Sequence, residues 1–253
     1  MSETIDLKYI IDTALEAGRV IMSVYVRDFD VEFKEDESPL TEADKKANEV
    51  ICSALKEKYP DIPILSEENK SIDYSVRKDW ERFWLVDPVD GTKEFIKKNG
   101  EFTVNIALVE DGVPILGVVY APAKDLMYSA EKGKGAYLNG QKLPLFTNQN
   151  PEEKLTVVAS RSHLSSETEE FINDLKKKTA HVESISVGSS LKLCFVAEGR
   201  ADYYPRLAPT MEWDTGAAHA IALEAGRKVV RYEDSLQLVY NKENLLNPWF
   251  VVS

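Results

Sequence analysis

The feature that most constrains this fold is the segment 84–92, which reads WLVDPVDGT. Its apolar half predicts a buried strand, and its end places two carboxylates, Asp87 and Asp90, on a turn that contains proline and glycine. Thr92 and Lys93 follow where a helix can begin, and the backbone N–H groups of a helix start can bind an anion. Carboxylate oxygens suit Mg²⁺. A site for metal and phosphate is the first interpretation, and a capping role for the aspartates is the alternative.

Length and composition describe an ordinary globular protein. The 253 residues allow one large domain or two modest ones, and 43% hydrophobic and 29% charged residues are typical of such chains. The longest apolar stretches are too short to span a membrane, and the acidic start, MSETID, lacks a signal-peptide pattern. We therefore expect a cytoplasmic protein, with peripheral association with the inner membrane left open.

Net charge and cysteine usage restrict the partners. A net charge of −12 opposes binding to a nucleic acid polymer, because such binding needs a basic face. The same charge is compatible with a small phosphorylated substrate, because bound divalent cations reverse the local sign. Cys52 and Cys194 lie in apolar, helix-like sequence, which predicts buried free thiols rather than a disulfide.

Hydrophobic periodicity predicts a mixed chain of helices and strands. Helices are expected over 6–26, 41–59, 92–98, 166–178, 191–198 and 213–225. Strands are expected over 62–65, 83–86, 102–109, 114–120, 155–159 and 228–231, with Gly199 and Gly226 ending the last two helices. A polar, turn-rich stretch near 147–155 predicts a boundary between an N-terminal α+β domain, 1–150, and a C-terminal α/β domain, 151–253.

Three further acidic residues are candidates for the same site. Glu67, in a Glu67-Glu68 pair after a short apolar strand, can supply a metal oxygen, although a solvated charge is the simpler explanation of the pair taken alone. Asp214 stands near the start of an apolar helix and is either a ligand from the second half of the chain or a favourable charge on the helix dipole. Asp44 follows Thr41 at capping-box spacing, and this structural role is compatible with orienting a water at a cleft.

Other common catalytic patterns lack support. His163, His181 and His219 have no zinc-site spacing, and His219 in an apolar helix is expected to serve packing or to lie on the surface. The chain has no G-x-S-x-G elbow and no Walker loop, so the serine-hydrolase and P-loop classes are disfavoured.

Taken together, these segments resemble the inositol-monophosphatase-like family of magnesium-dependent, lithium-sensitive phosphatases. The motifs DPVDGT at 87–92, LSEE at 65–68 and WD at 213–214 occur in the family's order across nearly the whole chain. Further stretches look like the CysQ-type 3′(2′),5′-bisphosphate nucleotidases, a branch of that family. These are 92–96, 99–107, 160–163, 188–192 and 204–214, whereas 216–219 (GAAH) departs from the small-residue order frequent in relatives.

The resemblance implies a five-layer αβαβα sugar-phosphatase fold, of mixed α/β class. It implies hydrolysis of the 3′-phosphate of adenosine 3′,5′-bisphosphate to AMP and phosphate, with the sulfated form, 3′-phosphoadenylyl sulfate, as a further substrate and a place in sulfur assimilation. The small-molecule partner is a phosphorylated nucleotide.

Carried over by motif, two or three Mg²⁺ ions would bind the carboxylates of four acidic residues and one carbonyl. These ligands are Glu67, Asp87, Asp90, Asp214 and the carbonyl of Val89. The substrate would contact much of the same set. Its predicted contacts are Glu67, Val89, Asp90, Gly91, Thr92 and Asp214, with the backbone N–H groups of Gly91 and Thr92 on the phosphate.

One ion would activate a water and another would stabilise the leaving oxygen. Asp44 and Thr92, together with Glu67, are the catalytic candidates for orienting or deprotonating that water. The second phosphate of the nucleotide needs a cation. Three basic residues lie beside the motifs and are candidates for this contact, and an ordinary surface charge is the alternative interpretation of each. These are Arg161, Lys192 and Arg206.

Two other functions remain open at this stage. The same chemistry could act on inositol monophosphate or a sugar bisphosphate, although Lys93-Glu94 stands where inositol monophosphatases usually have Thr-Asn. A phosphatase scaffold that only binds metal or nucleotide is the non-enzymatic alternative, which the retention of all four acidic residues disfavours.

Overall fold

The computed structural model describes residues 4–28, 31–33, 39–69, 72–159 and 165–253. Its helical elements are α1 (Leu7–Tyr25), α2 (Glu42–Lys58), the 3-10 helix η1 (Glu67–Asn69), α3 (Tyr74–Arg77), α4 (Thr92–Ile96), α5 (Ser166–Leu175), α6 (Leu191–Glu198) and α7 (Gly216–Glu224). Its strands are β1 (Val31–Phe33), β2 (Pro39–Thr41), β3 (Ile64–Ser66), β4 (Arg82–Asp90), β5 (Thr103–Glu110), β6 (Val113–Ala121), β7 (Leu126–Glu131), β8 (Gly135–Leu138), β9 (Gln141–Lys142), β10 (Lys154–Val158), β11 (His181–Ile185), β12 (Tyr204–Arg206), β13 (Val229–Arg231) and β14 (Phe250–Val252).

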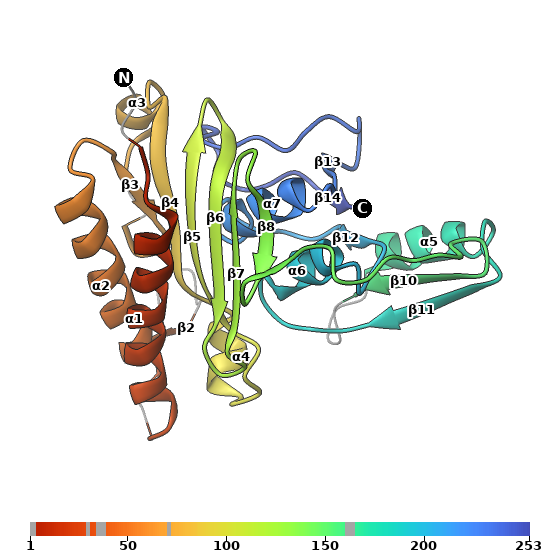
Figure 1. Ribbon diagram of the computed structural model, residues 1–253, viewed down its shortest axis with the longest axis horizontal. Helices are drawn as coiled ribbons and strands as arrows, with labels where there is room; N and C mark the ends of the chain where they lie inside the picture. The colour runs from red at the N-terminus through yellow and green to blue at the C-terminus, as the bar shows by residue number, and fades with distance from the viewer. Residues whose placement is uncertain (1–3, 29–30, 34–38, 70–71, 160–164) are drawn as a thin grey trace.

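These elements form five layers, α-β-α-β-α (Figure 1). The outer pair α1 and α2 packs on one face of a sheet that, in the described chain, has seven strands in the order β3-β4-β5-β6-β7-β8-β9. The helices α6 and α7 cover its other face, and the small sheets β10-β11 and β12-β14-β13 follow, with α5 outermost. The mixed α/β class and the layered architecture expected from the sequence are therefore confirmed.

The central strands are buried on both faces because helices cover both. Along β4, Phe83 and Leu85 belong to the apolar core shared with α6 and α7, whereas Trp84 and Val86 belong to the core shared with α1 and α2. Gly117 on β6 allows α7 to approach closely, since a Cβ there would lie 2.1 Å from the carbonyl oxygen of Ala217. The first α7 turns are thereby held against the middle of the sheet.

A bulge at the end of β4 brings its two aspartates to the same side. Asp87 pairs with Asn105 and Asp90 pairs with Thr103, so β4 has one residue more than β5 across this interval. In a regular strand, residues three apart face opposite ways. The extra residue reverses that alternation, and both carboxylates face the layer that contains α6 and α7.

Every helix and strand that periodicity predicted is present, but the structure adds short elements and shifts several ends. The prediction that Asp87 and Asp90 lie on a turn was wrong, because β4 continues through both residues by pairing with β5. The elements that were not predicted are η1, α3, β1, β2, β7, β8, β9, β11, β12 and β14. The last predicted helix starts at Gly216 rather than Trp213, because residues 212–215 form a turn in which the N–H groups of Thr215 and Gly216 donate to the Glu212 carbonyl. The helices predicted over 92–98 and 166–178 end at Ile96 and Leu175. Positive φ angles of 80° at Gly199 and 79° at Gly226 confirm both glycine stops.

The two cysteines and His219 can also be compared with their predicted environments. Cys52 and Cys194 are free and buried, as predicted. His219 is completely buried, so packing rather than surface exposure is its role. Burial lowers the pKa of His219 to about 3, so the ring is neutral and contacts the hydroxyl of Tyr240 through Nδ1.

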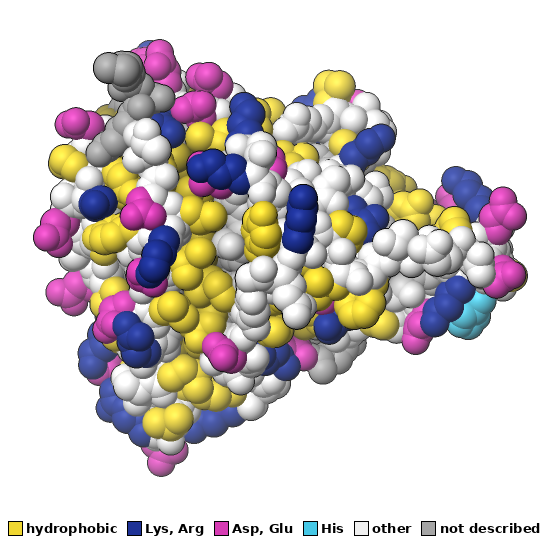
Figure 2. All heavy atoms as spheres, viewed as in Figure 1, with side chains coloured by type: hydrophobic (Ala, Val, Ile, Leu, Met, Phe, Trp, Pro, Cys, Tyr) yellow, Lys and Arg dark blue, Asp and Glu magenta, His cyan; other side chains and the backbone are white. Residues whose placement is uncertain are grey.

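Charged side chains of both signs are interspersed on the face seen in Figure 2, over α1 and over the tip formed by α5 and β11. None of the described helices is long and apolar enough to cross a membrane.

Candidate active site

Three carboxylates meet where the end of β4 approaches the start of α7. One oxygen each from Asp87, Asp90 and Asp214 lies within 4.8 Å of the others. Glu67, on η1 after the neighbouring strand β3, lies close enough to Asp87 and Asp214 for its charge to act on both. The four acidic side chains selected from the sequence thus come from three separate segments and converge on one place.

The convergence is electrostatically unfavourable unless cations balance it. Burial raises the pKa of Asp87 well above its usual value, and the charges of Glu67, Asp90 and Asp214 raise it further. Burial also raises the pKa of Asp214 to about 8, with Asp90 as the next contribution. Each carboxylate therefore resists ionisation while the others are charged.

Asp44 and Thr92 form a second unit beside these acids. Asp44 is the N3 residue of the capping box of α2 and accepts hydrogen bonds from the N–H and the hydroxyl of Thr41, at 2.8 and 2.6 Å. The Thr92 hydroxyl lies 3.3 Å from Asp44 Oδ1 and 3.3 Å from the Val89 carbonyl. Burial raises the pKa of Asp44 to about 6, and nearby Glu68 and Glu67 add to the rise. The capping and catalytic interpretations of Asp44 are thus compatible in space.

Gly91 joins β4 to α4 in a left-handed conformation with φ 91°. A Cβ at this position would lie 3.2 Å from the carbonyl oxygen of Glu101 and 3.3 Å from the Cβ of Ser189. Glycine is required here by backbone angle and crowding together. The tight turn places the predicted phosphate contacts, Gly91 and Thr92, directly after Asp90.

Two polar residues of the site had not been selected as site residues from the sequence, namely Ser190 and Asn105. The N–H and the hydroxyl of Ser190 lie 2.6 and 2.7 Å from Asp90 Oδ2, and Asn105 Nδ2 donates to the Ser190 hydroxyl at 2.9 Å. Both belong to segments quoted for the family resemblance. An amide between the apolar residues Val104 and Ile106 of a buried strand was the available signal for Asn105.

Hydrogen bonds in and around the turn before α7 hold Asp214 in place. The N–H of Met211 donates to Asp214 Oδ2 at 2.9 Å. Glu212, which is completely buried, accepts hydrogen bonds from the backbone N–H groups of Asn241 and Lys242 and from Lys242 Nζ, at 2.7, 3.0 and 2.5 Å. The segment that carries Asp214 is thereby tied to the loop after β13.

A cavity of about 150 Å³ opens beside the acids. Lys192 and Arg206 both line it, and Lys192 Nζ donates to the Ser189 carbonyl at 3.2 Å while Arg206 Nη2 donates to the Pro209 carbonyl at 2.6 Å. Two of the three basic candidates therefore face the acid site, and the third, Arg161, lies outside the described residues. Acidic and basic groups together line the cavity; its lining comprises Asp90, Gly91, Glu94, Ser189, Lys192, Leu193, Tyr204, Arg206, Thr210, Asp214 and Thr215.

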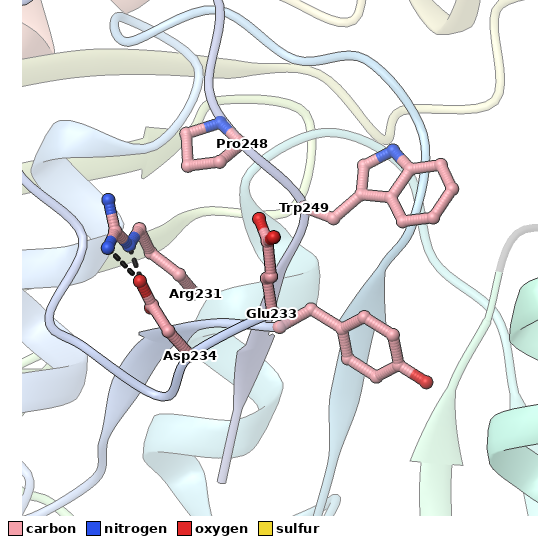
Figure 3. Close-up of a pocket in the computed structure, with 6 residues that line it drawn as sticks. Arg231, Glu233, Asp234, Pro248 and Trp249 are labelled. Carbon is pink, nitrogen blue, oxygen red and sulfur yellow. Dashed lines mark hydrogen bonds and ion pairs between the residues drawn. The ribbon is translucent and has the colours of Figure 1, made fainter.

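Another cavity, of about 670 Å³, lies near the C-terminal strands (Figure 3). Its lining is Arg231, Tyr232, Glu233, Asp234, Pro248 and Trp249. The guanidinium of Arg231 is paired with Asp234, as the dashed lines show. Its lining residues thus offer neither a group of metal-binding carboxylates nor an unpaired cation for a phosphate, so the chemistry is assigned to the cavity beside Asp90.

The donor set fits divalent cations. In the described part of the chain, Asp90 Oδ1 and Asp214 Oδ1 accept no hydrogen bond, whereas Oδ2 of each is held by protein donors. Each carboxylate is therefore fixed through one oxygen and free to bind through the other. An all-oxygen set of this kind suits Mg²⁺, Mn²⁺ or Ca²⁺.

Comparison with known proteins agrees with this geometry. The model of the inositol monophosphatase family matches residues 5–249. The chain belongs to the inositol monophosphatase family. This is a family of metal-dependent enzymes, and the acid cluster lies within the matched residues.

Among its relatives, the chain is 47% identical to the 3′(2′),5′-bisphosphate nucleotidase CysQ of Shigella flexneri over 251 residues, covering 98% of this chain and 99% of that protein. It is 46% identical to CysQ of Escherichia coli strain K12, with the same two coverages. The crystal structure of CysQ from Bacteroides thetaiotaomicron superposes with a TM-score of 0.87 at 50% identity, covering 98% of this chain and 96% of that one. An IMPase of Thermotoga maritima superposes with a TM-score of 0.79 at 28% identity, covering 98% and 91%.

Proposed function

We propose that this protein is a 3′(2′),5′-bisphosphate nucleotidase that hydrolyses the 3′-phosphate of adenosine 3′,5′-bisphosphate to give AMP and phosphate. The observation that carries the proposal is the near-complete alignment with CysQ enzymes at 46–47% identity. The acid cluster supplies the chemistry that such an enzyme requires. 3′-Phosphoadenylyl sulfate is a second substrate on this proposal, which gives the protein a role in sulfur metabolism in the cytoplasm.

We propose Mg²⁺ as the ion, held by Glu67, Asp87, Asp90, Asp214 and the carbonyl of Val89. When bound, two or three such ions neutralise the clustered carboxylates, lower the pKa of a water, and stabilise charge on the leaving oxygen. Inhibition by Li⁺ belongs to the same proposal.

The protein's own groups position the reactants. The backbone N–H groups of Gly91 and Thr92 hold the 3′-phosphate at the turn after Asp90. The Thr92 hydroxyl, within 3.3 Å of Asp44, holds the attacking water, and Asp44 accepts its proton. A base with a pKa of about 6 is matched to this task near neutral pH.

Lys192 and Arg206 suit the second phosphate. Both line the cavity that adjoins Asp90, so a nucleotide with its 3′-phosphate on the acids can extend its 5′-phosphate toward them. Inositol monophosphate has no second phosphate for these cations. This difference favours the bisphosphate nucleotide over the inositol substrate.

The test is phosphate release from adenosine 3′,5′-bisphosphate and from inositol 1-phosphate, measured side by side with Mg²⁺ and with EDTA. We expect fast release from the nucleotide that EDTA abolishes. Preferential release from inositol 1-phosphate would instead assign the protein to the inositol monophosphatases proper, and no release from either would favour a binding protein.

A further inference from the structure

Ser190 stands at the N-cap position of α6, where a serine usually caps its own helix. Its side chain makes no such capping hydrogen bond. The residue is 2% exposed, and its hydroxyl is directed instead at the acid site. A helix-capping explanation therefore does not account for this side chain.

The contacts of Ser190 join the two halves of the acid cluster. Its hydroxyl oxygen lies 2.7 Å from Asp90 Oδ2, at the end of β4, and 2.6 Å from the backbone carbonyl of Asp214, before α7. Its N–H donates to the same Asp90 oxygen at 2.6 Å. One residue thus contacts two acidic residues that are far apart in the chain.

Asn105 holds the hydroxyl in this orientation. Asn105 is 1% exposed on β5, and its Nδ2 lies 2.9 Å from the Ser190 hydroxyl and 3.4 Å from Asp90 Oδ2. The serine hydroxyl has a single hydrogen, which Asp90 and the Asp214 carbonyl share, while its lone pair accepts from Asn105. The backbone N–H remains on Asp90 whichever acceptor the hydrogen occupies.

We propose that Ser190 is a positioning residue that fixes the Asp90 carboxylate and the Asp214 backbone relative to each other, with Asn105 supporting it. The spacing of two predicted metal ligands is then set by one hydroxyl that is bonded to Asp90, the Asp214 carbonyl and Asn105. This inference rests on the proposed metal-dependent function. Partners of this kind behind metal ligands typically contribute 10- to 100-fold to metal affinity or activity.

The test measures Mg²⁺ binding by titration calorimetry without substrate, for the full-length wild type, Ser190→Ala, Ser190→Thr and the control Ser129→Ala. Ser129 is buried on β7 and lies outside the acid site. Since Ser190→Ala keeps the N–H on Asp90, we expect about 10-fold weaker Mg²⁺ binding, at the lower end of that range. The threonine variant should restore affinity to within about 3-fold of the wild type, and Ser129→Ala should bind Mg²⁺ as the wild type does.

A second readout separates positioning from mere stability. The thermal midpoint of each variant is measured in EDTA and in Mg²⁺. A structural serine lowers both midpoints equally, whereas loss of a positioning residue reduces the increase that Mg²⁺ produces. Equal lowering in both conditions, or an unchanged Mg²⁺ affinity in Ser190→Ala, would overturn the proposal.

Asn105→Ala provides an independent variant should the added methyl of Ser190→Thr prevent folding. We expect it to weaken Mg²⁺ binding too. The double variant with Ser190→Ala should lose less than the sum of the two single losses, because Asn105 acts partly through the Ser190 hydroxyl. Additive losses would contradict the shared role. A wild type that binds Mg²⁺ but hydrolyses no bisphosphate nucleotide would remove the proposed substrate and leave this inference standing.

Discussion

At the scale of single residues, the proposed metal site depends on carboxylates that protein donors fix through one oxygen and that can bind a cation through the other. Asp90 shows this most clearly, since Ser190 and Asn105 hold its Oδ2. Replacing the carboxylate by an amide keeps an oxygen for those donors and removes the charge that a cation needs. The effect of such a change therefore falls on catalysis more than on folding.

Asp90→Asn should accordingly lower kcat by at least about 100-fold, the scale of losing one electrostatic stabiliser of the transition state. Its circular dichroism spectrum should match that of the wild type. Its unfolding midpoint in EDTA should be no lower, because loss of the Asp90 charge relieves repulsion with Asp87 and Asp214. Asp61→Asn, the same change at an exposed position, is the control and should leave turnover unchanged. Wild-type turnover in Asp90→Asn would remove this residue from the metal site.

Lys192 and Arg206 give a prediction about specificity. Lys192→Met or Arg206→Met should raise KM for adenosine 3′,5′-bisphosphate about 10-fold, because each loses a charge-assisted contact, and should change kcat little. With adenosine 3′-monophosphate, which lacks the second phosphate, the variants should match the wild type. An equal KM increase for both substrates would mean that these cations do not bind the 5′-phosphate. Lys178→Met, at an exposed position, is the matched control.

At the scale of elements, the turn before α7 is held by the ion pair of the buried Glu212 with the partly exposed Lys242. The carboxylate is completely buried, and the lysine links it to the loop that follows β13. Breaking such a pair leaves a buried charge without its partner, which typically costs 3–5 kcal/mol. The position of Asp214 thus depends on two residues, Glu212 and Lys242, that are not among the lining of the cavity beside Asp90.

Lys242→Met should lower the free energy of unfolding by about 3 kcal/mol in denaturant titrations with EDTA present, the lower end of that range, because two backbone N–H groups still bind Glu212. The added change Glu212→Gln should recover part of the loss. Lys8→Met, which breaks the exposed pair with Asp12, is the control and should have no measurable effect. A loss no larger in Lys242→Met than in this control would show that the pair does not anchor the turn.

The comparison of sequence and structure is also clearest at the scale of elements. The strand at 84–86, the capping box at Thr41 and the glycine stops were predictable because local pattern determines them. The bulge in β4 was not, since it is defined by pairing with β5. The late start of α7 at Gly216 follows from a turn that tertiary contacts of Glu212 stabilise.

The residues of the candidate site also differ in whether the sequence predicts them. Acidic residues in recognisable motifs were predictable from the sequence, and the structure brings Asp87, Asp90 and Asp214 together. Ser190 and Asn105 were not selected, because their importance comes from hydrogen bonds to Asp90 across long separations in the chain. The partition of residues 1–150 and 151–253 into two domains stays a prediction.

At the scale of the whole molecule, we expect the acid cluster to couple folding to pH and to bound metal. The pKa values of Asp44 and Asp214 rise from 3.8 to about 6 and about 8, chiefly because of burial, and that of Asp87 rises as well. A carboxyl whose pKa is higher in the folded state favours folding while protonated. Its contribution is complete below the unfolded pKa and is lost as pH rises through the folded value.

We therefore expect the stability of the metal-free protein to fall between about pH 4 and about pH 8, the range set by the ordinary and raised pKa values of Asp214. Saturating Mg²⁺ should remove most of this fall, because cations favour the ionised carboxylates. Thermal midpoints measured across this range, with EDTA and with Mg²⁺, check both statements. Asp214→Asn should flatten the EDTA profile; stability that rises with pH in EDTA would contradict the assignment.

We propose above all that metal held by these acids directs hydrolysis to one phosphate of the nucleotide. Phosphorus-31 NMR of adenosine 3′,5′-bisphosphate during turnover tests it most directly. With the wild type and Mg²⁺, we expect the 3′-phosphate resonance to disappear and the 5′-phosphate resonance to persist as AMP. With EDTA, or with Asp90→Asn, the 3′-phosphate resonance should remain. Loss of the 5′-phosphate, or undiminished hydrolysis by Asp90→Asn, would contradict it.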